Sequence, residues 1–475
     1  MPRDYYLLID GELKHGVSSF AVINPATEKP IASCPKADET ILNDAVAAAK
    51  CAFSGWSARS IEDRASLVEA LANQLEERAI EFANLLTSEQ GKPHDQAMYE
   101  IMGSVFTLRA FAKMRLEEKV LREEGDNRVI EHRTPLGVIG AIMPWNFPVI
   151  LLMNKLGPAL VTGNTIVAKP APTTPLTTLL FGEICKDTLP PGVVNIICDE
   201  NDLGEAMTIH PDIAKIAFTG STSTGRRVMA SAASNIKRVS LELGGNDAAI
   251  VLDDIDPKLA AEKVYHGAMT NAGQICVAIK RAYVPEGIYD EFCEAIAELA
   301  KSAIVDDGSK QGTTIGPVQN QKQYERVREL LEDARRSGVI IAGGEVMDRD
   351  GYFITPTIVR DLDDDARLVR EEQFGPVLPV LKYNNIEEVV DRANNSEYGL
   401  GGSIWGQDVK RAIDIAKRIE TGTVWVNQFL AIDPNIPFRG SKQSGLGGEL
   451  GESGFHEYTQ PHIVNAVSLI APITT

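Results

Sequence analysis

The N-terminal part of the chain carries the apolar spacing of amphipathic helices. One helix is predicted to begin after Asp38, because apolar residues then recur on one face at positions 41, 42, 45, 46 and 49. Another begins after Ser60, which opens a capping-box pattern. A third is expected to end at Gly91, and a long one to run from Pro93 toward Glu118.

From Val138 the pattern changes to short apolar runs that alternate with helical stretches. The runs of this first series read VIGAIM, TIVAK, VVNIIC, KIAFTG and RVSLEL. Near-continuous apolar strands that alternate with helices are typical of a parallel sheet covered on both faces. Five such strands predict an α/β fold with a Rossmann-like, dinucleotide-binding domain.

A second alternating series starts just after Gly244 and Gly245. Its runs read AAIVL, RAYVP, FITPTIV, VLPVLKY and TVWVN. The restart indicates a second α/β domain. Charged and apolar residues alternate over Asn127–Arg133, as in an exposed strand, and Tyr458–Ile470 has the pattern of another extended strand.

Length and composition restrict the class of protein. The 475 residues are too many for one ordinary core, so two or more domains are expected. A net charge of -19 argues against binding to nucleic acid or to an anionic membrane surface. Neither a secretory leader nor a membrane span is predicted, and the six cysteines and seven histidines show no metal-ligand spacing. The sequence therefore predicts a cytoplasmic protein without a metal.

Cys276 and Glu242 are candidates for a nucleophile and a base. Cys276 follows Gly273-Gln274-Ile275 in a stretch of small, uncharged residues, where backbone N–H groups can hold an oxyanion. Glu242 ends an apolar strand before two glycines. The alternative for Cys276 is a buried structural cysteine, and the alternative for Glu242 is a surface carboxylate. We assign the structural role to the other five cysteines.

Asn146 lies in the stretch PWNFP, between Trp145 and Phe147 and bracketed by two prolines. Asparagine beside proline is common in turns. A side-chain amide held by rigid neighbours can also donate to a developing oxyanion.

Phe218–Gly225 reads FTGSTSTG and follows a predicted strand. It lacks the G-x-G-x-x-G fingerprint, and Gly/Ser/Thr turns are common. Its place before a predicted helix nevertheless favours phosphate binding at a helix N-terminus.

These stretches resemble the aldehyde dehydrogenase superfamily, and the resemblance runs from INPAT at Ile23–Thr27 to the C-terminal strand. It implies that the Cys276 thiolate attacks an aldehyde, that Asn146 holds the oxyanion, and that Glu242 activates the water that hydrolyses a thioester. It also implies proton-relay roles for Lys155 and for Glu449, which lies in PFRGSKQSGLGGELG.

The resemblance implies NAD as the hydride acceptor. The residues that it assigns to cofactor binding are Trp145, Lys169, Gly220, Ser221, Gly225, Glu372 and Phe374. Many relatives carry a glutamate three residues after the lysine, which binds the ribose hydroxyls and repels a 2′-phosphate. This chain has Pro172 there, so NADP is expected to be accepted as well.

The resemblance also implies three parts and a homodimer or homotetramer. Residues 1–119 and 134–243 would form the cofactor domain and 244–455 the catalytic domain. A β-ribbon of residues 120–133 and 456–475 would pair with another subunit.

The predicted substrate is a neutral, medium-sized aliphatic or aromatic aldehyde. The residues that the resemblance assigns to the substrate channel are Phe147, Ile150, Leu151, Asn154, Ile275 and Phe438. Because of Arg439, an acidic semialdehyde, the substrate of succinate-semialdehyde dehydrogenases, is the alternative. A thiol esterase and a catalytically silent binding protein on the same fold remain as alternatives from other classes.

Overall fold

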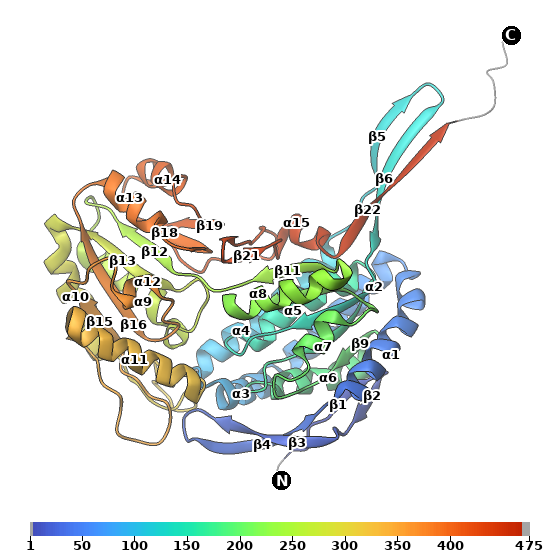
Figure 1. Cartoon of the computed structure of the whole chain (residues 1–475), viewed down its shortest axis with the longest axis horizontal. Coiled ribbons are helices and arrows are strands. Elements are labelled where there is room, and N and C mark those ends of the chain that lie inside the picture. Colours follow the sequence, from blue (N-terminus) through green and yellow to red (C-terminus); the bar gives the residue numbers. More distant parts are fainter. Residues whose placement is uncertain (1–2, 468–475) are drawn as a thin grey trace.

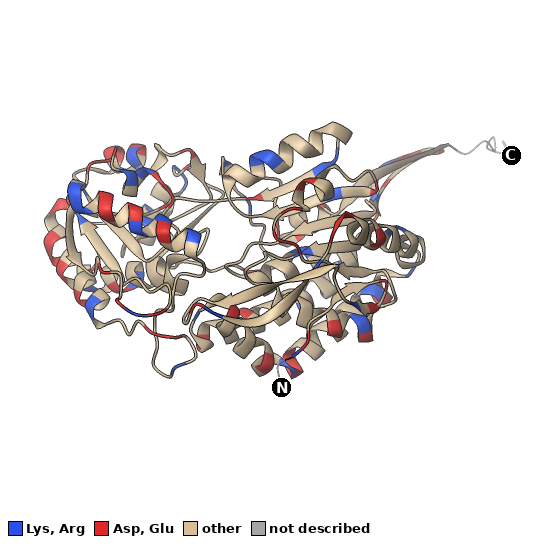
Figure 2. Cartoon of the chain, turned by 60° about the horizontal axis from the view of Figure 1, so that its bottom comes forward, with Lys and Arg blue, Asp and Glu red and all other residues tan. Residues whose placement is uncertain are grey.

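The structure, a computed structural model that describes residues 3–467, contains two large sheets flanked by helices and a narrow projecting arm (Figure 1). Charged residues are concentrated in the helices and loops, and the central strands carry few of them (Figure 2). Within the described residues, no helix is both long and apolar enough to cross a membrane.

The first sheet has eight strands, and its five central strands are parallel, as the apolar runs predicted. Short antiparallel partners close both edges. In sheet order the strands are β2 (Glu12–Lys14), β1 (Leu7–Ile9), β9 (Val194–Ile196), β8 (Thr165–Lys169), β7 (Val138–Ile142), β10 (Ile213–Thr219), β11 (Arg238–Glu242) and β21 (Gly445–Leu446). The predicted Rossmann-like arrangement is confirmed.

Eight helices accompany this sheet, five of them in contact with its strands and three packed on other helices. They are α1 (Glu39–Ser57), α2 (Ile61–Glu77), α3 (Ala79–Gln90), α4 (His94–Lys113), α5 (Pro148–Val161), α6 (Leu176–Thr188), α7 (Gly204–Ile209) and α8 (Thr222–Ala232). The predicted caps form, since Asp38 accepts from the Ile41 N–H and Ser60 from the Asp63 N–H. Gly91 ends α3 with a φ of 94°. The long helix stops at Lys113, short of the predicted Glu118.

The second sheet has seven strands. In order they are β14 (Val339–Ala342), β15 (Thr357–Arg360), β16 (Val377–Tyr383), β13 (Ile279–Pro285), β12 (Asp247–Val251), β18 (Gly401–Trp405) and β19 (Thr423–Val426). Its helices are α9 (Pro257–Met269), α10 (Tyr289–Ser302), α11 (Gln321–Ser337), α12 (Arg367–Arg370), α13 (Ile386–Asn394) and α14 (Val409–Ala416).

Three details of this sheet differ from the prediction. The strand predicted over FITPTIV begins only at Thr357, since Pro356 has no N–H to donate to a ladder and Ile354 instead bridges Val346. The interior strand β18 was not predicted, because its sequence, GGSIW, opens with two glycines and gives a weak strand signal. The edge strand β14 was not predicted either.

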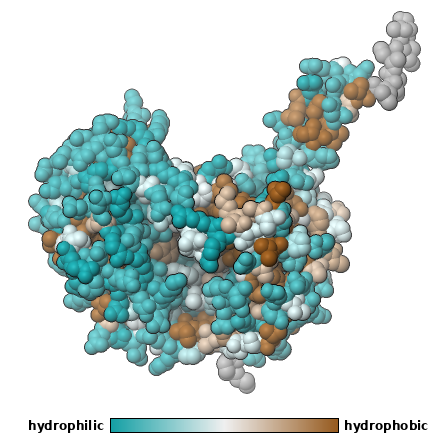
Figure 3. Space-filling model, viewed as in Figure 1, coloured by the Kyte–Doolittle hydropathy of each residue, from teal (hydrophilic) through white to brown (hydrophobic). Residues whose placement is uncertain are grey.

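The projecting arm consists of β5 (Lys119–Glu124), β6 (Asn127–Pro135) and β22 (Thr459–Val467), paired antiparallel. Val120, Leu121, Ile463 and Val464 are exposed on it, and Figure 3 shows apolar patches there. The predicted C-terminal strand is present up to Val467, and its last part, 468–470, lies outside the described residues.

The remaining elements are short or peripheral. They are the hairpin β3 (Ser18–Asn24) and β4 (Lys29–Lys36), the pair β17 (Tyr398–Gly399) and β20 (Ser441–Lys442), helix α15 (Gly451–His456), and the 3-10 turns η1 (Ala233–Asn235), η2 (Thr270–Gly273) and η3 (Glu286–Ile288).

Candidate active site

The backbone around Cys276 is held in an unusual conformation. Just before it, Asn271 and Ala272 both have a φ of 53° and Gly273 has a φ of 71°. A Cβ at Gly273 would lie 2.3 Å from the Gly375 carbonyl oxygen, so only glycine fits there. Non-glycine residues in this conformation cost free energy and are concentrated at functional sites. Cys276 lies in the short segment between η2 and β13.

Glu242 ends β11 next to the phosphate-type turn, since the Gly220 N–H donates to the Glu242 carbonyl oxygen over 3.0 Å. Its carboxyl group is buried, and neither oxygen has a hydrogen-bond partner among the described residues. Burial raises the pKa of the Glu242 carboxyl to about 8; the nearby Glu449 charge adds to the rise and the Lys155 ammonium opposes it. A buried carboxyl with a pKa near neutrality is suited to accept a proton.

The half-buried Cys276 thiol and the Glu242 carboxyl lie near enough to perturb each other's ionisation. Burial raises the pKa of the Cys276 thiol, and the Glu242 charge raises it further. The Lys280 ammonium acts in the opposite direction and donates to the Cys276 carbonyl oxygen over 2.6 Å. The fold thus brings the predicted nucleophile and the predicted base together.

Asn146 lies between β7 and α5, and its side-chain amide donates to the Gln274 carbonyl oxygen over 3.0 Å, two residues before Cys276. The Lys92 ammonium holds the Asn146 carbonyl oxygen at 2.9 Å. Glu100 pairs with Lys92 and accepts from the Val149 N–H at the start of α5. Because Lys92 and Glu100 are completely buried, they fix the loop that presents Asn146.

A buried ion pair lies behind Glu242. The Lys155 ammonium donates to a Glu449 oxygen over 2.7 Å and to the Thr219 hydroxyl over 2.6 Å. The other Glu449 oxygen accepts from the Asn154 amide over 3.4 Å, so Asn154 faces this pair. Glu242 and Glu449 both line a cavity of about 10 Å³, which is roughly the room that one water needs.

The family assignment rests on the whole chain as well as on this geometry. The model of the aldehyde dehydrogenase family matches residues 13–464. This chain belongs to the aldehyde dehydrogenase family.

Relatives and solved structures agree with the assignment. Human aldehyde dehydrogenase 1A1 is 39% identical over 96% of this chain and 93% of its own length. The NAD+ complex of an aldehyde dehydrogenase from Bacillus cereus superposes with a TM-score of 0.95 at 37% identity, over 98% of this chain and 97% of that one. An E. coli enzyme described as NADP dependent has the same TM-score at 34% identity and covers 98% of both chains. The protein is therefore an NAD(P)-dependent aldehyde dehydrogenase.

The residues at the carboxyl edge of the first sheet fit a dinucleotide. Gly220 follows β10, and a Cβ there would lie 2.6 Å from the Phe218 ring. Gly225 packs equally closely on Leu243. Ser221 caps α8, whose first turn has no acidic residue, so the helix N-terminus presents N–H groups suited to a diphosphate. Lys169 ends β8, and Pro172 lies half-buried in the turn that follows it.

The second sheet contributes Glu372 and Phe374 from the opposite side. A Glu372 oxygen accepts from the Gly245 N–H over 3.0 Å and lies 3.5 Å from the Lys280 ammonium. The Phe374 ring contacts the Trp145 ring edge-on, with centroids 5.3 Å apart. The residues predicted for the nicotinamide end therefore lie beside Asn146 and Cys276, whereas Lys169 ends β8, which is three strands from β11 in the first sheet, and Pro172 follows it.

The predicted channel residues are largely apolar. Phe147, Ile150 and Leu151 are half-buried at the start of α5, a helix otherwise buried along its length. Ile275 and Phe438 are buried, and the Phe438 backbone pairs with that of Glu449. Arg439 is exposed and donates to Ser453.

Sequence reasoning missed four buried charged residues that support the aldehyde dehydrogenase site: Lys92, Glu100, Asp199 and Lys280. Lys280 lies close to Cys276 in the sequence, and this was the only local sign that any of the four belongs to the site. The others come from distant elements, and their contacts arise only in the fold.

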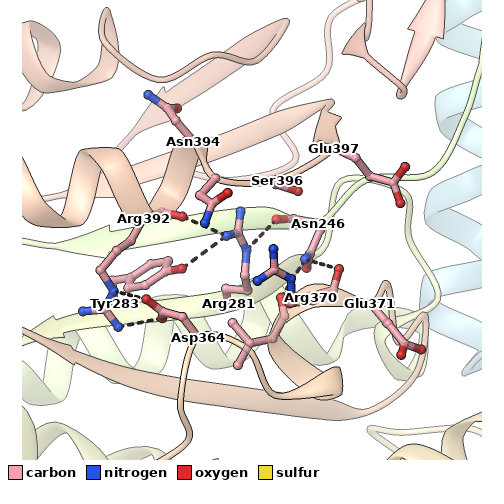
Figure 4. A pocket seen from close by; sticks show the side chains of 12 residues that line it. Asn246, Arg281, Tyr283, Asp364, Arg370, Glu371, Arg392, Asn394, Ser396 and Glu397 are labelled. Carbon is pink, nitrogen blue, oxygen red and sulfur yellow. Dashed lines mark hydrogen bonds and ion pairs between the residues drawn. The ribbon is translucent and has the colours of Figure 1, made fainter.

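Another cavity, of about 520 Å³, lies in the second half of the chain and is distinct from the site around Cys276 (Figure 4). Its charged groups are already paired: Arg281 donates to the Asn246 and Ala393 carbonyl oxygens, and Arg392 pairs with Asp364. Its lining contains no cysteine, so it does not offer the thiol nucleophile that Cys276 supplies.

Proposed function

We propose that this enzyme oxidises a neutral, medium-sized aliphatic or aromatic aldehyde to its carboxylic acid through a thioester on Cys276. The observation that carries the proposal is the buried Glu242 carboxyl, which has no hydrogen-bond partner among the described residues and lies next to the Cys276 thiol. Such a carboxyl stays poised for a proton instead of serving as a structural acceptor.

The first step forms a carbon–sulfur bond. The half-buried Cys276 thiol releases its proton to solvent water, the thiolate sulfur attacks the aldehyde carbon, and the carbonyl oxygen becomes an oxyanion. The Asn146 amide has two N–H groups, and one of them is used by the Gln274 carbonyl. The other is suited to hold the oxyanion together with the Cys276 backbone N–H.

When bound, NAD accepts the hydride from the substrate carbon. Glu372, which the Gly245 N–H and Lys280 position, would orient the ribose beside Cys276. Trp145 and Phe374 would exclude water from one side of this end of the site.

Hydrolysis of the thioester consumes one water. Glu242 takes a proton from the water, the oxygen attacks the acyl carbon, and the carbon–sulfur bond breaks to release the acid. The proton must then leave a buried group. Glu449, which pairs with Lys155 and lines the same small cavity as Glu242, is suited to receive it.

We also propose that the three parts predicted from the sequence act as a cofactor domain, a catalytic domain and a contact between subunits. The exposed apolar residues of the arm support the last of these, because such residues on unpaired strands favour pairing with another chain.

A substrate panel distinguishes a preference for neutral aldehydes from a preference for acidic ones. It contains aliphatic and aromatic aldehydes and one acidic semialdehyde, and kcat/KM is measured for each with NAD and with NADP. The apolar channel predicts a higher kcat/KM for neutral aldehydes. A preference for the semialdehyde would instead favour a role for Arg439. Ester hydrolysis without any reduction of cofactor would favour the thiol esterase, and no turnover at all the binding protein.

A pH profile tests the role of Glu242. Only the ionised carboxylate accepts a proton, so with a pKa of about 8 the hydrolytic rate should fall as the pH is lowered through 8 and level off above it. Because the Glu449 charge raises the pKa of Glu242, Glu449→Gln should move the midpoint down by roughly one pH unit. The control is Glu452→Gln, an exposed acid on α15, which should leave the midpoint unchanged. A midpoint that stays or rises in Glu449→Gln would contradict this assignment.

Pro172 is expected to influence the choice between NAD and NADP. Pro172→Glu should raise the ratio of kcat/KM for NAD over that for NADP by about tenfold or more, because a carboxylate there would accept from the ribose hydroxyls and repel a 2′-phosphate. Pro172→Gln matches the size without the charge and should produce a smaller change. An unchanged ratio in well-folded Pro172→Glu would mean that another residue governs the choice.

A further inference from the structure

Lys169 and Asp199 form a buried ion pair at the carboxyl edge of the first sheet. The Lys169 ammonium lies 2.6 Å from an Asp199 oxygen, with side-chain exposures of 4% and 0%. The other Asp199 oxygen accepts from the Leu203 N–H over 2.8 Å. Asp199 is therefore fixed by two elements and points its charge at Lys169.

The position of this pair relates it to the cofactor. The central strands run in the order β9, β8, β7, β10 and β11, and Glu242 at the end of β11 lies beside Cys276. The nicotinamide must approach Cys276 to receive the hydride. A dinucleotide laid along the carboxyl edge would then extend its other end, the adenosine, toward β8 and β9. Lys169 ends β8, and Asp199 follows β9.

Charge at this end determines whether a 2′-phosphate is tolerated. An unpaired Lys169 ammonium would attract the phosphate, and Pro172 in the adjacent turn offers no charge to oppose it. Asp199 cancels the lysine charge at contact distance in a buried setting, where screening by water and salt is weak. The sequence pattern, which left Lys169 unpaired, missed this neutralisation.

We propose that Asp199 is a specificity-determining residue that disfavours NADP by neutralising Lys169, in place of a glutamate at position 172. This proposal rests on the cofactor site proposed above. Asp199 acts through Lys169, so the alternative is a purely structural pair that only holds the loop after β9.

The test is Asp199→Asn, which keeps an oxygen for the Leu203 N–H but removes the negative charge. Dissociation constants for NAD and NADP are measured by titration calorimetry on the full chain without aldehyde, followed by kcat/KM for both cofactors. The ratio of NADP affinity to NAD affinity should rise roughly tenfold. Weakening of both cofactors by the same factor would indicate a structural role and overturn the proposal.

The matched control is Asp202→Asn. Asp202 lies on the same loop and pairs with Lys36 at 3.0 Å, but it is about half exposed and does not contact Lys169. Its substitution removes the same charge and should leave the affinity ratio unchanged. An equal rise in this variant would show a general effect of net charge and contradict the proposal.

Asp199→Glu covers the case in which Asp199→Asn does not fold. It keeps the negative charge beside Lys169, so the ratio of NADP affinity to NAD affinity should stay unchanged. A rise in this ratio with the charge retained would overturn the proposal. Turnover of aldehyde with NAD is expected in every outcome, so the proposed function is tested separately.

Discussion

Cys276→Ala should abolish aldehyde oxidation, with kcat reduced by at least about 10⁴-fold, and should abolish ester hydrolysis as well. The substitution removes the only atom proposed to bond to the substrate, and no later step can proceed without the thioester. The dissociation constant for NAD should stay nearly unchanged, because the cofactor is held mainly by other residues. The measurements are steady-state NADH formation, hydrolysis of an activated ester and calorimetric NAD binding.

Cys51→Ala is the control for this result. Cys51 is exposed on α1, far along the chain from η2, and should tolerate alanine with full activity. Appreciable steady-state NADH production by Cys276→Ala would reject Cys276 as the nucleophile.

Glu242→Gln should separate the two halves of the reaction. Glutamine keeps the shape of the side chain but cannot take a proton from water, so hydrolysis should slow by roughly 10²–10⁴-fold while hydride transfer persists. Stopped-flow absorbance should then show a burst of NADH, at most equal to the concentration of active sites, followed by a slow phase.

Hydroxylamine provides the matching rescue. It attacks a thioester without a general base, so it should restore turnover in Glu242→Gln more than in the unaltered enzyme. Turnover of the acyl-enzyme at the unaltered rate, without hydroxylamine, would show that Glu242 is not the hydrolytic base.

Local patterns in the sequence were sufficient for much of the fold. The five central strands of the first sheet are largely buried, and their near-continuous apolar runs made them predictable. Asp38 and Ser60 cap helices because their short side chains reach the N–H of a residue three positions later, which is a local effect. The strand β18 was missed because its position is set by pairing with β12 and β19, not by its own composition.

The candidate site, like the fold, was predictable only in part from local sequence patterns. Cys276, Glu242 and Asn146 lie in motifs that can be read directly. The groups that control their charge and position come from elsewhere in the chain: Lys92 from the end of α3 reaches Asn146, and Asp199 reaches Lys169 from a different strand. Electrostatic control depends on distances of a few ångströms in the folded chain, and a sequence pattern carries no such distances.

The central claim is that the aldehyde is oxidised while bound to Cys276. Glu242→Gln, incubated with NAD and one neutral aldehyde and quenched in acid, can be measured by intact-protein and peptide mass spectrometry. Oxidation on Cys276 predicts a mass gain equal to that of the aldehyde less two hydrogens, confined to the peptide with Cys276 and lost after hydroxylamine. NADH formed in the burst without that adduct, or an adduct on another residue, would contradict it.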